Sequence, residues 1–271
     1  MTKKILFLSI VLFAATFSFA AKVDTVQVES KAMQKLIKNV IVTPDSYEKS
    51  EVYPVVYLLH GATGNYSNWV LRAPVVENLA DMYNVIIVCP DGGYTSWYFD
   101  SPIDNTYKYE TYVAKELVDF IDSNYSTVKN KSGRAITGLS MGGHGGLYLG
   151  FRHQNIFGAA GSMSGGVDIR PFPNNWDIAK RLGTLADEPE NWEKNTIINM
   201  TGLLENSSLK LIIDCGIDDF FYDVNVALHN KLLEIKYPHD FIIRPGAHNW
   251  QYWNNAVLYQ FLYFSDFFNQ N

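Results

Sequence analysis

The stretch TGLSMGGHGG, residues 137–146, constrains the fold of this chain more than any other segment. Half of its positions are glycine, and Ser140 stands at the centre of a G-x-S-x-G pattern between Gly138 and Gly142. The short apolar run Arg134–Thr137 before it predicts a strand, and a helical segment follows it. Side chains at the flanking glycines would strike neighbouring backbone in so sharp a turn. The pattern therefore predicts a serine hydroxyl presented at the tip of a strand-turn-helix unit.

Eight short apolar runs, rich in Val and Ile, predict buried strands. Apolar residues at helical spacing separate many of them, as in the segments 109–125, 224–235 and 256–268, and Leu147–Arg152 also predicts a helix. Alternating strands and helices predict an α/β protein whose mostly parallel sheet carries helices on both faces. Functional loops then gather at the carboxyl ends of the strands. The predicted strands are Thr25–Val28, Val40–Thr43, Val55–Leu59, Val85–Cys89, Ala135–Thr137, Ala159–Met163, Leu209–Ile213 and Phe241–Ile243.

Length, charge and the first residues bound the class of protein. The 271-residue chain has a net charge of −6 and a pI near 5.5, which argue against a nucleic-acid-binding protein. Residues 1–20 predict a secretory signal peptide, because two lysines precede an apolar run and small residues follow it. The alternative, a membrane anchor, needs about 20 apolar residues. We expect an exported protein, periplasmic or extracellular, with one domain over residues 21–271 and an irregular insertion at about 167–208.

Acidic residues and a histidine follow predicted strands downstream of Ser140. Asp218 and Asp219 stand in LIIDCGIDDFF, and His248 stands in RPGAHNWQYW. Serine, aspartate and histidine in this chain order are typical of hydrolases built on such a sheet. The order predicts a serine nucleophile, with His248 as its general base and a carboxylate that orients the imidazole ring.

The segment LLHGATGN places Ala62 just past a predicted strand. In sheets of this kind the third-strand loop supplies one backbone N–H to the oxyanion hole, and the residue after the nucleophile supplies another. We therefore expect the N–H groups of Ala62 and Met141 to hold a developing oxyanion. His60 is interpreted as structural. The other histidines show no metal-ligand spacing, so no metal and no cofactor are expected.

These motifs resemble the esterase D-like family of the α/β-hydrolases. The matching stretches are VVYLLHG, PDGGYTSWY, RAITGLSMGGHGGLYL, GSMSGG, DCGIDDFF and GAHNWQYW. That family includes S-formylglutathione hydrolases, tributyrin esterases and carbohydrate esterases acting on feruloyl or acetyl groups, with mycolyltransferases as more distant members. The resemblance implies an α/β-hydrolase fold around an eight-stranded sheet, with Ser140 as nucleophile and His248 as base. It also places the acid at the last position of G-x-x-D, which selects Asp219 over Asp218.

Cys89 and Cys215 each end a predicted strand and leave two alternatives, a disulfide in an exported protein or two buried thiols. The strand order implied by the resemblance puts three strands between them. At about 4.8 Å per step, their Cα atoms would lie on the order of 19 Å apart. A disulfide needs roughly 4.4–6.8 Å. We therefore expect two free, buried thiols.

Residues and resemblance together predict a secreted serine carboxylesterase that hydrolyses acyl esters, with acetyl or feruloyl groups on carbohydrate as the expected substrates. Two alternatives stay open. An acyltransferase would use the same residues with a sugar hydroxyl as acceptor, and product analysis with an added acceptor separates the two. A non-catalytic carbohydrate-binding protein would have no use for a complete Ser140–Asp219–His248 set.

The expected partner is a small-molecule or oligosaccharide ester. Nucleic acid is not expected, nor stable membrane insertion after signal cleavage. Aromatic side chains at the predicted active edge are expected to stack on the substrate, and Asp91 and Asp100 beside them to accept hydrogen bonds from sugar hydroxyls. The aromatic residues with this predicted role are Tyr66, Trp97, Tyr98 and Trp250.

Overall fold

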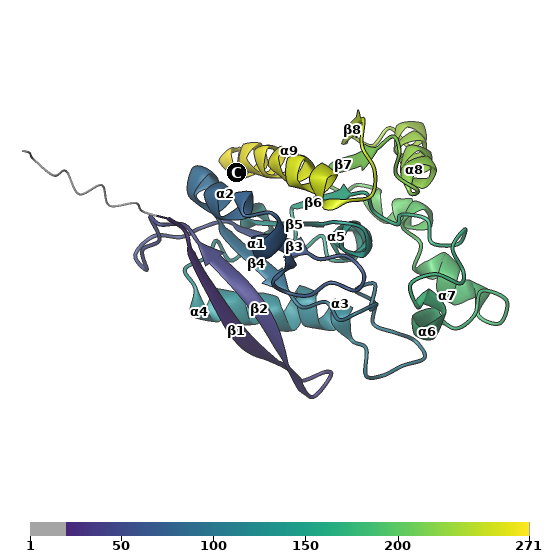
Figure 1. Ribbon diagram of the computed structural model, residues 1–271, viewed down its shortest axis with the longest axis horizontal. Coiled ribbons are helices and arrows are strands. Elements are labelled where there is room, and N and C mark those ends of the chain that lie inside the picture. Colours follow the sequence, from purple (N-terminus) through teal and green to yellow (C-terminus); the bar gives the residue numbers. More distant parts are fainter. Residues whose placement is uncertain (1–19, 271) are drawn as a thin grey trace, which may run out of the picture.

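A computed structural model describes residues 20–270, so nearly all of the predicted signal peptide, residues 1–19, lies outside the described residues. The described chain forms an eight-stranded sheet in the order β1-β2-β4-β3-β5-β6-β7-β8 (Figure 1). Strands β3 to β8 pair in parallel, whereas β1 and β2 form an antiparallel hairpin that adds to β4. All eight predicted strands are present: β1 (Lys22–Ser30), β2 (Lys35–Thr43), β3 (Val55–Leu59), β4 (Ile86–Pro90), β5 (Arg134–Gly138), β6 (Ala159–Met163), β7 (Lys210–Gly216) and β8 (Asp240–Arg244).

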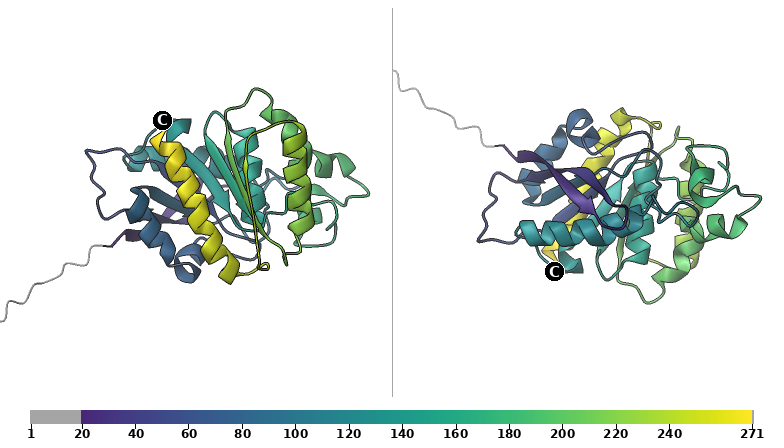
Figure 2. Two further views of the ribbon diagram at one scale, coloured as in Figure 1. Left: turned by 90° about the horizontal axis from the view of Figure 1, so that it is seen from above. Right: turned by 90° about the horizontal axis from the view of Figure 1, so that it is seen from below.

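Helices cover both faces of this sheet, as Figure 2 shows from above and below. On one face α1 (Asn68–Arg72), α2 (Val75–Tyr83) and α9 (Trp250–Asn269) pack together. The other face carries α5 (Met141–Arg152), α8 (Tyr222–Glu234) and a continuous helical stretch. That stretch consists of α3 (Tyr109–Thr111), a π-helical turn (Tyr112–Leu117) and α4 (Val118–Asn124). The predicted mostly parallel, doubly covered sheet is confirmed.

The period-two geometry of the strands explains how one sheet feeds two cores. Val55, Tyr57 and Leu59 of β3 contribute to the core beneath α5, whereas Val56 and Leu58 contribute to the core beneath α9. All five residues are buried, because successive side chains of a strand point to opposite faces. The continuous apolar runs in the sequence are thus what a sheet buried on both faces requires.

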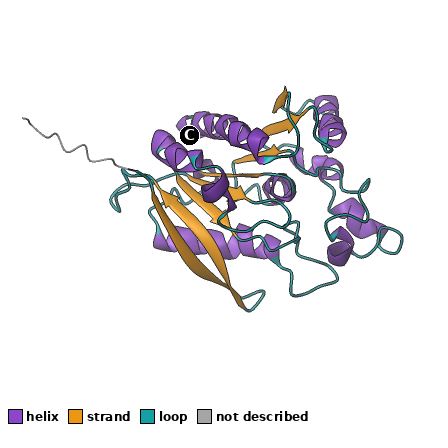
Figure 3. Ribbon diagram, viewed as in Figure 1, coloured by secondary structure: helices purple, strands orange, loops and turns teal. Residues whose placement is uncertain are grey.

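The predicted insertion lies between β6 and β7 and holds only short helices and loops (Figure 3). Its helices are α6 (Ile178–Leu182), α7 (Pro189–Lys194) and a 3-10 turn (Ile197–Leu204), and a further 3-10 turn (Lys131–Gly133) precedes β5. Leu182, Trp192 and Ile197 anchor the insertion in the core on the α5 face. Within residues 20–270 no helix is both long enough and apolar enough to cross a membrane.

The two cysteines occupy the places that the strand order predicts. Cys89 lies on β4 and Cys215 on β7, and strands β3, β5 and β6 run between them. Both thiols are buried and free. The prediction of two unpaired, buried thiols is confirmed.

Candidate active site

Ser140 stands at a strained turn between β5 and α5. Its backbone angles are φ 56° and ψ −118°, a region that non-glycine residues rarely occupy. The Ser140 N–H donates to the carbonyl of Met163 at 2.9 Å, which holds the turn against β6. A Cβ on Gly138 or on Gly142 would lie 2.6 Å or 2.5 Å from the carbonyl oxygen of Leu59. The glycines therefore let the turn approach the neighbouring strand, as predicted.

Ser140, His248 and Asp219 come together from three separate loops. Nε2 of His248 lies 2.9 Å from the Ser140 Oγ. Nδ1 of His248 lies 3.0 Å and 2.9 Å from the two carboxylate oxygens of Asp219. The Asp219 side chain is fully buried, and its Oδ1 also accepts a hydrogen bond from the N–H of Phe221 at 2.8 Å. The arrangement allows His248 to take the hydroxyl proton of the serine while a buried carboxylate orients the ring.

The neighbouring acid points elsewhere. The side chain of Asp218 is exposed, and its backbone N–H donates to the carbonyl of Gly246 at 2.9 Å. Asp219 rather than Asp218 therefore faces His248, in agreement with the G-x-x-D alignment. The catalytic role of these residues stays a prediction.

The two predicted oxyanion donors both lie close to the nucleophile. Met141 is the first residue of α5, so its N–H has no acceptor within the helix. Ala62 lies past β3 in a loop that packs on the elbow, where a Cβ on Gly61 would be 3.2 Å from the Cβ of Ser140. The positive end of the α5 dipole also points toward Ser140. The role of these two N–H groups as an oxyanion hole stays a prediction.

A cavity of about 510 Å³ opens over the nucleophile. Arg72 is the only lysine, arginine, aspartate or glutamate among its lining residues, and its guanidinium carbon lies 5.9 Å from the centre of the Trp250 ring. Among the described residues, no ion pair with a carboxylate engages Arg72. The lining consists of Gly61, Ala62, Thr63, Gly64, Asn68, Arg72, Leu139, Ser140, Trp176, Phe220, His248, Trp250 and Trp253.

Aromatic rings form the wall of this cavity beside His248. Phe220 is 51% exposed, stacks on Trp176 at 5.6 Å between centroids, and lies 4.1 Å from the His248 ring. Trp253 contacts His248 edge-on at 4.9 Å and Trp250 at 5.6 Å. Trp250 thus lines the cavity and its contact with substrate stays a prediction, whereas sequence reasoning missed Phe220. Its position directly after Asp219 was the available signal, because the loop that delivers the acid also delivers this ring.

The prediction that Trp97 and Tyr98 form an exposed stacking surface is wrong. Their exposed fractions are 1% and 0%, because both residues adopt left-handed backbone angles, φ 55° and 60°, that turn them into the core. The indole N–H of Trp97 donates to the carbonyl of Trp176 at 3.2 Å. The hydroxyl of Tyr98 donates to the carbonyl of His60 at 3.0 Å. Both side chains support loops near the site and cannot stack on a substrate in this arrangement.

Three further residues expected to contact substrate lie outside the cavity lining. The ring of Tyr66 lies under the ammonium of Lys38, 5.6 Å away. The carboxylate of Asp91 accepts from the N–H of Gly93 in its own loop. Asp100 accepts from the N–H and hydroxyl of Thr111 at 2.9 Å and 2.5 Å. Asp91 thus closes a turn in its own loop and Asp100 bonds the start of the π-helical stretch, and neither acid lines the cavity over Ser140, so their contact with sugar hydroxyls stays a prediction.

The remaining histidines have structural surroundings. His144 is buried, and burial lowers its pKa to about 4. His229 and His239 contact each other at 2.8 Å beside β8. Among residues 20–270 there is no group of three or more His, Cys, Asp or Glu side chains that could hold a metal ion.

A serine on a strained strand-helix turn, bonded to a histidine that a buried carboxylate orients, defines a serine hydrolase of the α/β-hydrolase fold. The family model described as "Putative esterase" matches residues 30–264, and the chain belongs to this family. It is 28% identical over 234 residues to an acetyl esterase of Caldicellulosiruptor saccharolyticus, covering 80% of this chain and 85% of that one.

Two other relatives show the range of the family. A solved ferulic acid esterase superposes with a TM-score of 0.80 at 29% identity, covering 93% of this chain and all of that one. The diacylglycerol acyltransferase/mycolyltransferase Ag85B of Mycobacterium leprae is 27% identical over 275 residues, covering 85% of this chain and 80% of that one. These relationships support a carboxylic ester hydrolase, and the predicted family and enzyme class are confirmed.

Proposed function

We propose that the protein is an exported serine carboxylesterase that removes acetyl or feruloyl groups from carbohydrate through an acyl-enzyme on Ser140. The observation that carries the proposal is the hydrogen-bonded chain Ser140–His248–Asp219 at the floor of an aromatic cavity. Phe220 lines this cavity and is half exposed, so a bulky alcohol portion could extend along it toward solvent while the ester carbonyl reaches the serine.

The proposed reaction proceeds in two halves. Nε2 of His248 takes the proton of Ser140 as Oγ attacks the ester carbonyl, and the N–H groups of Met141 and Ala62 hold the oxyanion. Each such donor is worth roughly 3–4 kcal/mol in comparable enzymes. His248 then gives the proton to the departing alcohol, which leaves an acyl-Ser140 ester. Water then gives a proton to His248 as it attacks the acyl group, and His248 returns that proton to the Ser140 Oγ as the acid departs.

The substrate class rests on the cavity wall and on the relatives. Trp176 and Phe220 form a stacked pair with an exposed ring, and flat rings of this kind pack on the apolar faces of sugars and on phenolic acids. The relatives named acetyl esterase and ferulic acid esterase act on the two acyl groups that the proposal names. Export is motivated by the charged and apolar pattern of residues 1–20.

The test of the reaction is a panel of acetyl, butyryl, feruloyl and S-formyl esters assayed with the purified protein. Hydrolysis should disappear in Ser140→Ala, and a phosphonate directed at serine nucleophiles should label the wild type once, at Ser140. Labelling at another residue, or turnover in the variant, would refute the nucleophile. Repeating the assay with an oligosaccharide acceptor and analysing the products would reveal a transferase, as expected from the mycolyltransferase relatives, if the acyl group moves to sugar instead of water.

The test of the substrate class compares kcat/KM for acetylated or feruloylated xylo-oligosaccharides with that for aryl esters of the same acyl group. We expect the sugar portion to add more than about tenfold, or roughly 1.4 kcal/mol of transition-state binding. Trp176→Ala and Phe220→Ala should reduce that ratio. Tyr94→Ala is the matched control, since Tyr94 is 62% exposed and lies outside the cavity lining. If Trp176→Ala and Phe220→Ala leave the ratio as unchanged as the control does, this wall is not the carbohydrate site.

A further inference from the structure

The N–H of Ala62, one of the two proposed oxyanion donors, belongs to the same peptide unit as the carbonyl of Gly61. This unit is planar and trans, so its C=O and N–H point in opposite directions. Any contact that fixes the Gly61 oxygen therefore also fixes where the Ala62 N–H points. Gly61 and Ala62 both line the cavity with Ser140.

Two donors hold the Gly61 oxygen. Nδ1 of His60 lies 2.8 Å from it, and the N–H of Gly64 donates to it at 3.1 Å. Both contacts lie on the carbonyl side of the peptide, which leaves the Ala62 N–H on the opposite side. The orientation of this peptide thus depends directly on the side chain of His60.

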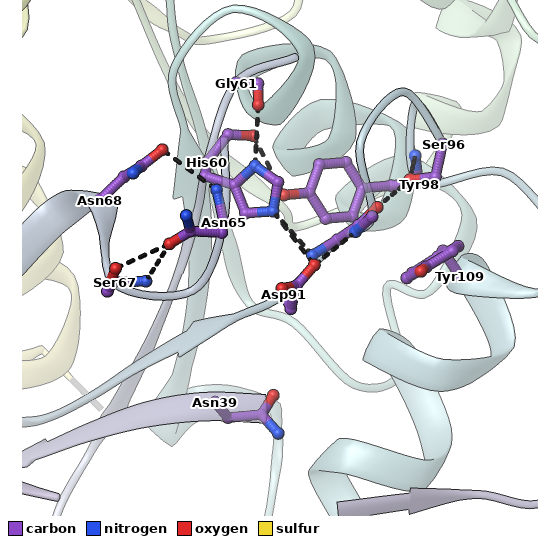
Figure 4. A network of polar contacts seen from close by, with 12 residues as sticks. Asn39, His60, Gly61, Asn65, Ser67, Asn68, Asp91, Ser96, Tyr98 and Tyr109 are labelled. Carbon is purple, nitrogen blue, oxygen red and sulfur yellow. Dashed lines mark hydrogen bonds and ion pairs between the residues drawn. The ribbon is translucent and has the colours of Figure 1, made fainter. Parts of the chain in front are cut away.

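The partners of His60 define its tautomer. The Gly61 oxygen can only accept, so Nδ1 carries the proton, and the N–H of Gly92 can only donate, so Nε2 at 2.8 Å is the acceptor. The side chain is 1% exposed, and burial lowers its pKa against the opposing effects of the Gly61 carbonyl and of Asp91. A neutral ring in this tautomer bridges the loops that follow β3 and β4 (Figure 4).

Further contacts brace the same bridge. The hydroxyl of Tyr98 donates to the His60 carbonyl at 3.0 Å, and the N–H of Thr63 donates to the carbonyl of Tyr94 at 2.7 Å. On the other side, a Cβ on Gly61 would lie 2.6 Å from a methyl carbon of Leu139, directly before the nucleophile. The loop is therefore held between the β4 loop and the elbow, with little freedom to rotate.

We propose that His60 is a positioning residue for the oxyanion hole: its Nδ1–H holds the Gly61 carbonyl so that the Ala62 N–H faces the oxygen that becomes charged on attack by Ser140. The inference rests on the proposed acyl-enzyme reaction. It gives a role to a buried histidine that the proton transfers of His248 do not use.

Three variants separate this role from simple packing. His60→Asn places an amide nitrogen close to the position of Nδ1 and keeps a donor for the Gly61 carbonyl. His60→Gln reaches the position of Nε2 and keeps an acceptor for the Gly92 N–H. His60→Leu keeps neither. His153→Gln is the control, since His153 is a partly buried histidine that bonds Glu110, away from the cavity.

Two measurements are made on each variant, in addition to its melting temperature. One is kcat and KM for an aryl acetate. The other is the affinity for phenylboronic acid, whose tetrahedral adduct with Ser140 places an anionic oxygen in the hole. We expect kcat to fall about 10²-fold in His60→Leu and in His60→Gln, since losing one oxyanion donor costs about 10²–10³. KM should change little, boronate affinity should fall in parallel with kcat, and His60→Asn should stay within about tenfold of the wild type.

Equal losses in the Asn and Gln variants, unchanged boronate affinity, or losses that follow the melting temperature would overturn the proposal. If His60→Leu does not fold, the comparison of the Asn and Gln variants carries the test alone. Boronate binding requires no turnover. A wild type that hydrolyses no ester of the panel would therefore refute the proposed function while the position of the Ala62 N–H is still measured.

Discussion

Replacing Asp219 by asparagine should force His248 into the wrong tautomer without changing the size of the side chain. The Asp219 Oδ1 accepts from the N–H of Phe221 at 2.8 Å, so the carbonyl oxygen of an asparagine is held there. Its NH₂ group then occupies the position of Oδ2, 2.9 Å from Nδ1 of His248. The amide oxygen at the Oδ1 position, 3.0 Å from Nδ1, can still accept from it, but a donor at the Oδ2 position favours an accepting Nδ1 and so places the ring proton on Nε2. That nitrogen, 2.9 Å from the Ser140 Oγ, could no longer take the serine proton.

The size of the effect follows from the alternatives open to the buried amide. Flipping it would face its NH₂ group toward the Phe221 N–H, and such an unsatisfied buried donor costs roughly 1–3 kcal/mol. The imidazolium would also lose the carboxylate that stabilises its charge. Together these effects predict a fall in kcat of about 10⁴, the size known for this substitution in serine proteases. This corresponds to an increase of about 5 kcal/mol in the activation free energy.

The assay is kcat for an aryl acetate at pH 7, with melting temperatures to show that the fold is retained. Asp218→Asn is the matched control, because it makes the same chemical change one residue away on an exposed side chain. We expect the control to stay within about threefold of the wild type, as is usual for surface substitutions. A variant of Asp219 that keeps a tenth of the activity, or a control that loses more than it, would refute the assignment of the acid.

Three other predictions follow from buried and charged groups. Burial raises the pKa of Glu110, but the hydrogen bonds it accepts from a histidine, an arginine and a tyrosine outweigh burial and lower the pKa to about 2 from 4.5. Its stabilising contribution is therefore complete above pH 4.5 and lost as the pH falls toward 2, and Glu110→Gln should remove on the order of 3 kcal/mol at pH 7. The measurement is the free energy of unfolding in urea at a series of pH values. If Glu110→Gln loses stability below pH 4.5 as steeply as the wild type, the prediction is wrong. Burial of Cys89 and Cys215 raises the pKa of both thiols. A thiol reagent should therefore modify neither cysteine in the native protein and both after unfolding. A protein mass lower by two hydrogen atoms, as for a disulfide, would be incompatible with the sheet order. Arg72→Gln should lower kcat/KM for esters whose alcohol carries a carboxylate by about two- to fivefold, the effect of an exposed ion pair. Hydrolysis of neutral esters should be unaffected. Equal losses for both kinds of ester would show that the Arg72 guanidinium forms no ion pair with the substrate carboxylate.

The sheet could be predicted from sequence because each strand is a short Val- and Ile-rich run that the fold buries on both faces. The start of α5 could not. It begins at Met141, six residues before the predicted helix, and its first turns are rich in glycine, which has poor helix propensity. Packing explains the difference, since a Cβ on Gly146 would lie 2.5 Å from the carbonyl oxygen of Gly161 in β6. Close packing of α5 against the sheet thus outweighs the low helix propensity of its glycines.

The catalytic geometry could be predicted because chain order and strand ends determine which loops meet. The aromatic wall could not, because exposure of a ring depends on the local backbone. Trp97 and Tyr98 share a loop composition that suggests exposure, yet their left-handed angles turn both inward. Phe220 follows a buried acid, and nothing in its apolar type indicates that it is exposed. Sequence patterns locate loops well, but they do not determine which way each side chain in a loop faces.

The insertion between β6 and β7 contributes a single residue, Trp176, to the cavity lining. Ser140, His248 and the oxyanion donors all come from other loops. Part of the aromatic wall therefore lies on a segment that supplies no catalytic residue, although Phe220 arrives with the loop of the acid. An insertion of different sequence, anchored by the same buried residues, could replace Trp176 while the nucleophile, base and acid keep their positions. Engineering of the substrate range of this protein can therefore begin at the insertion.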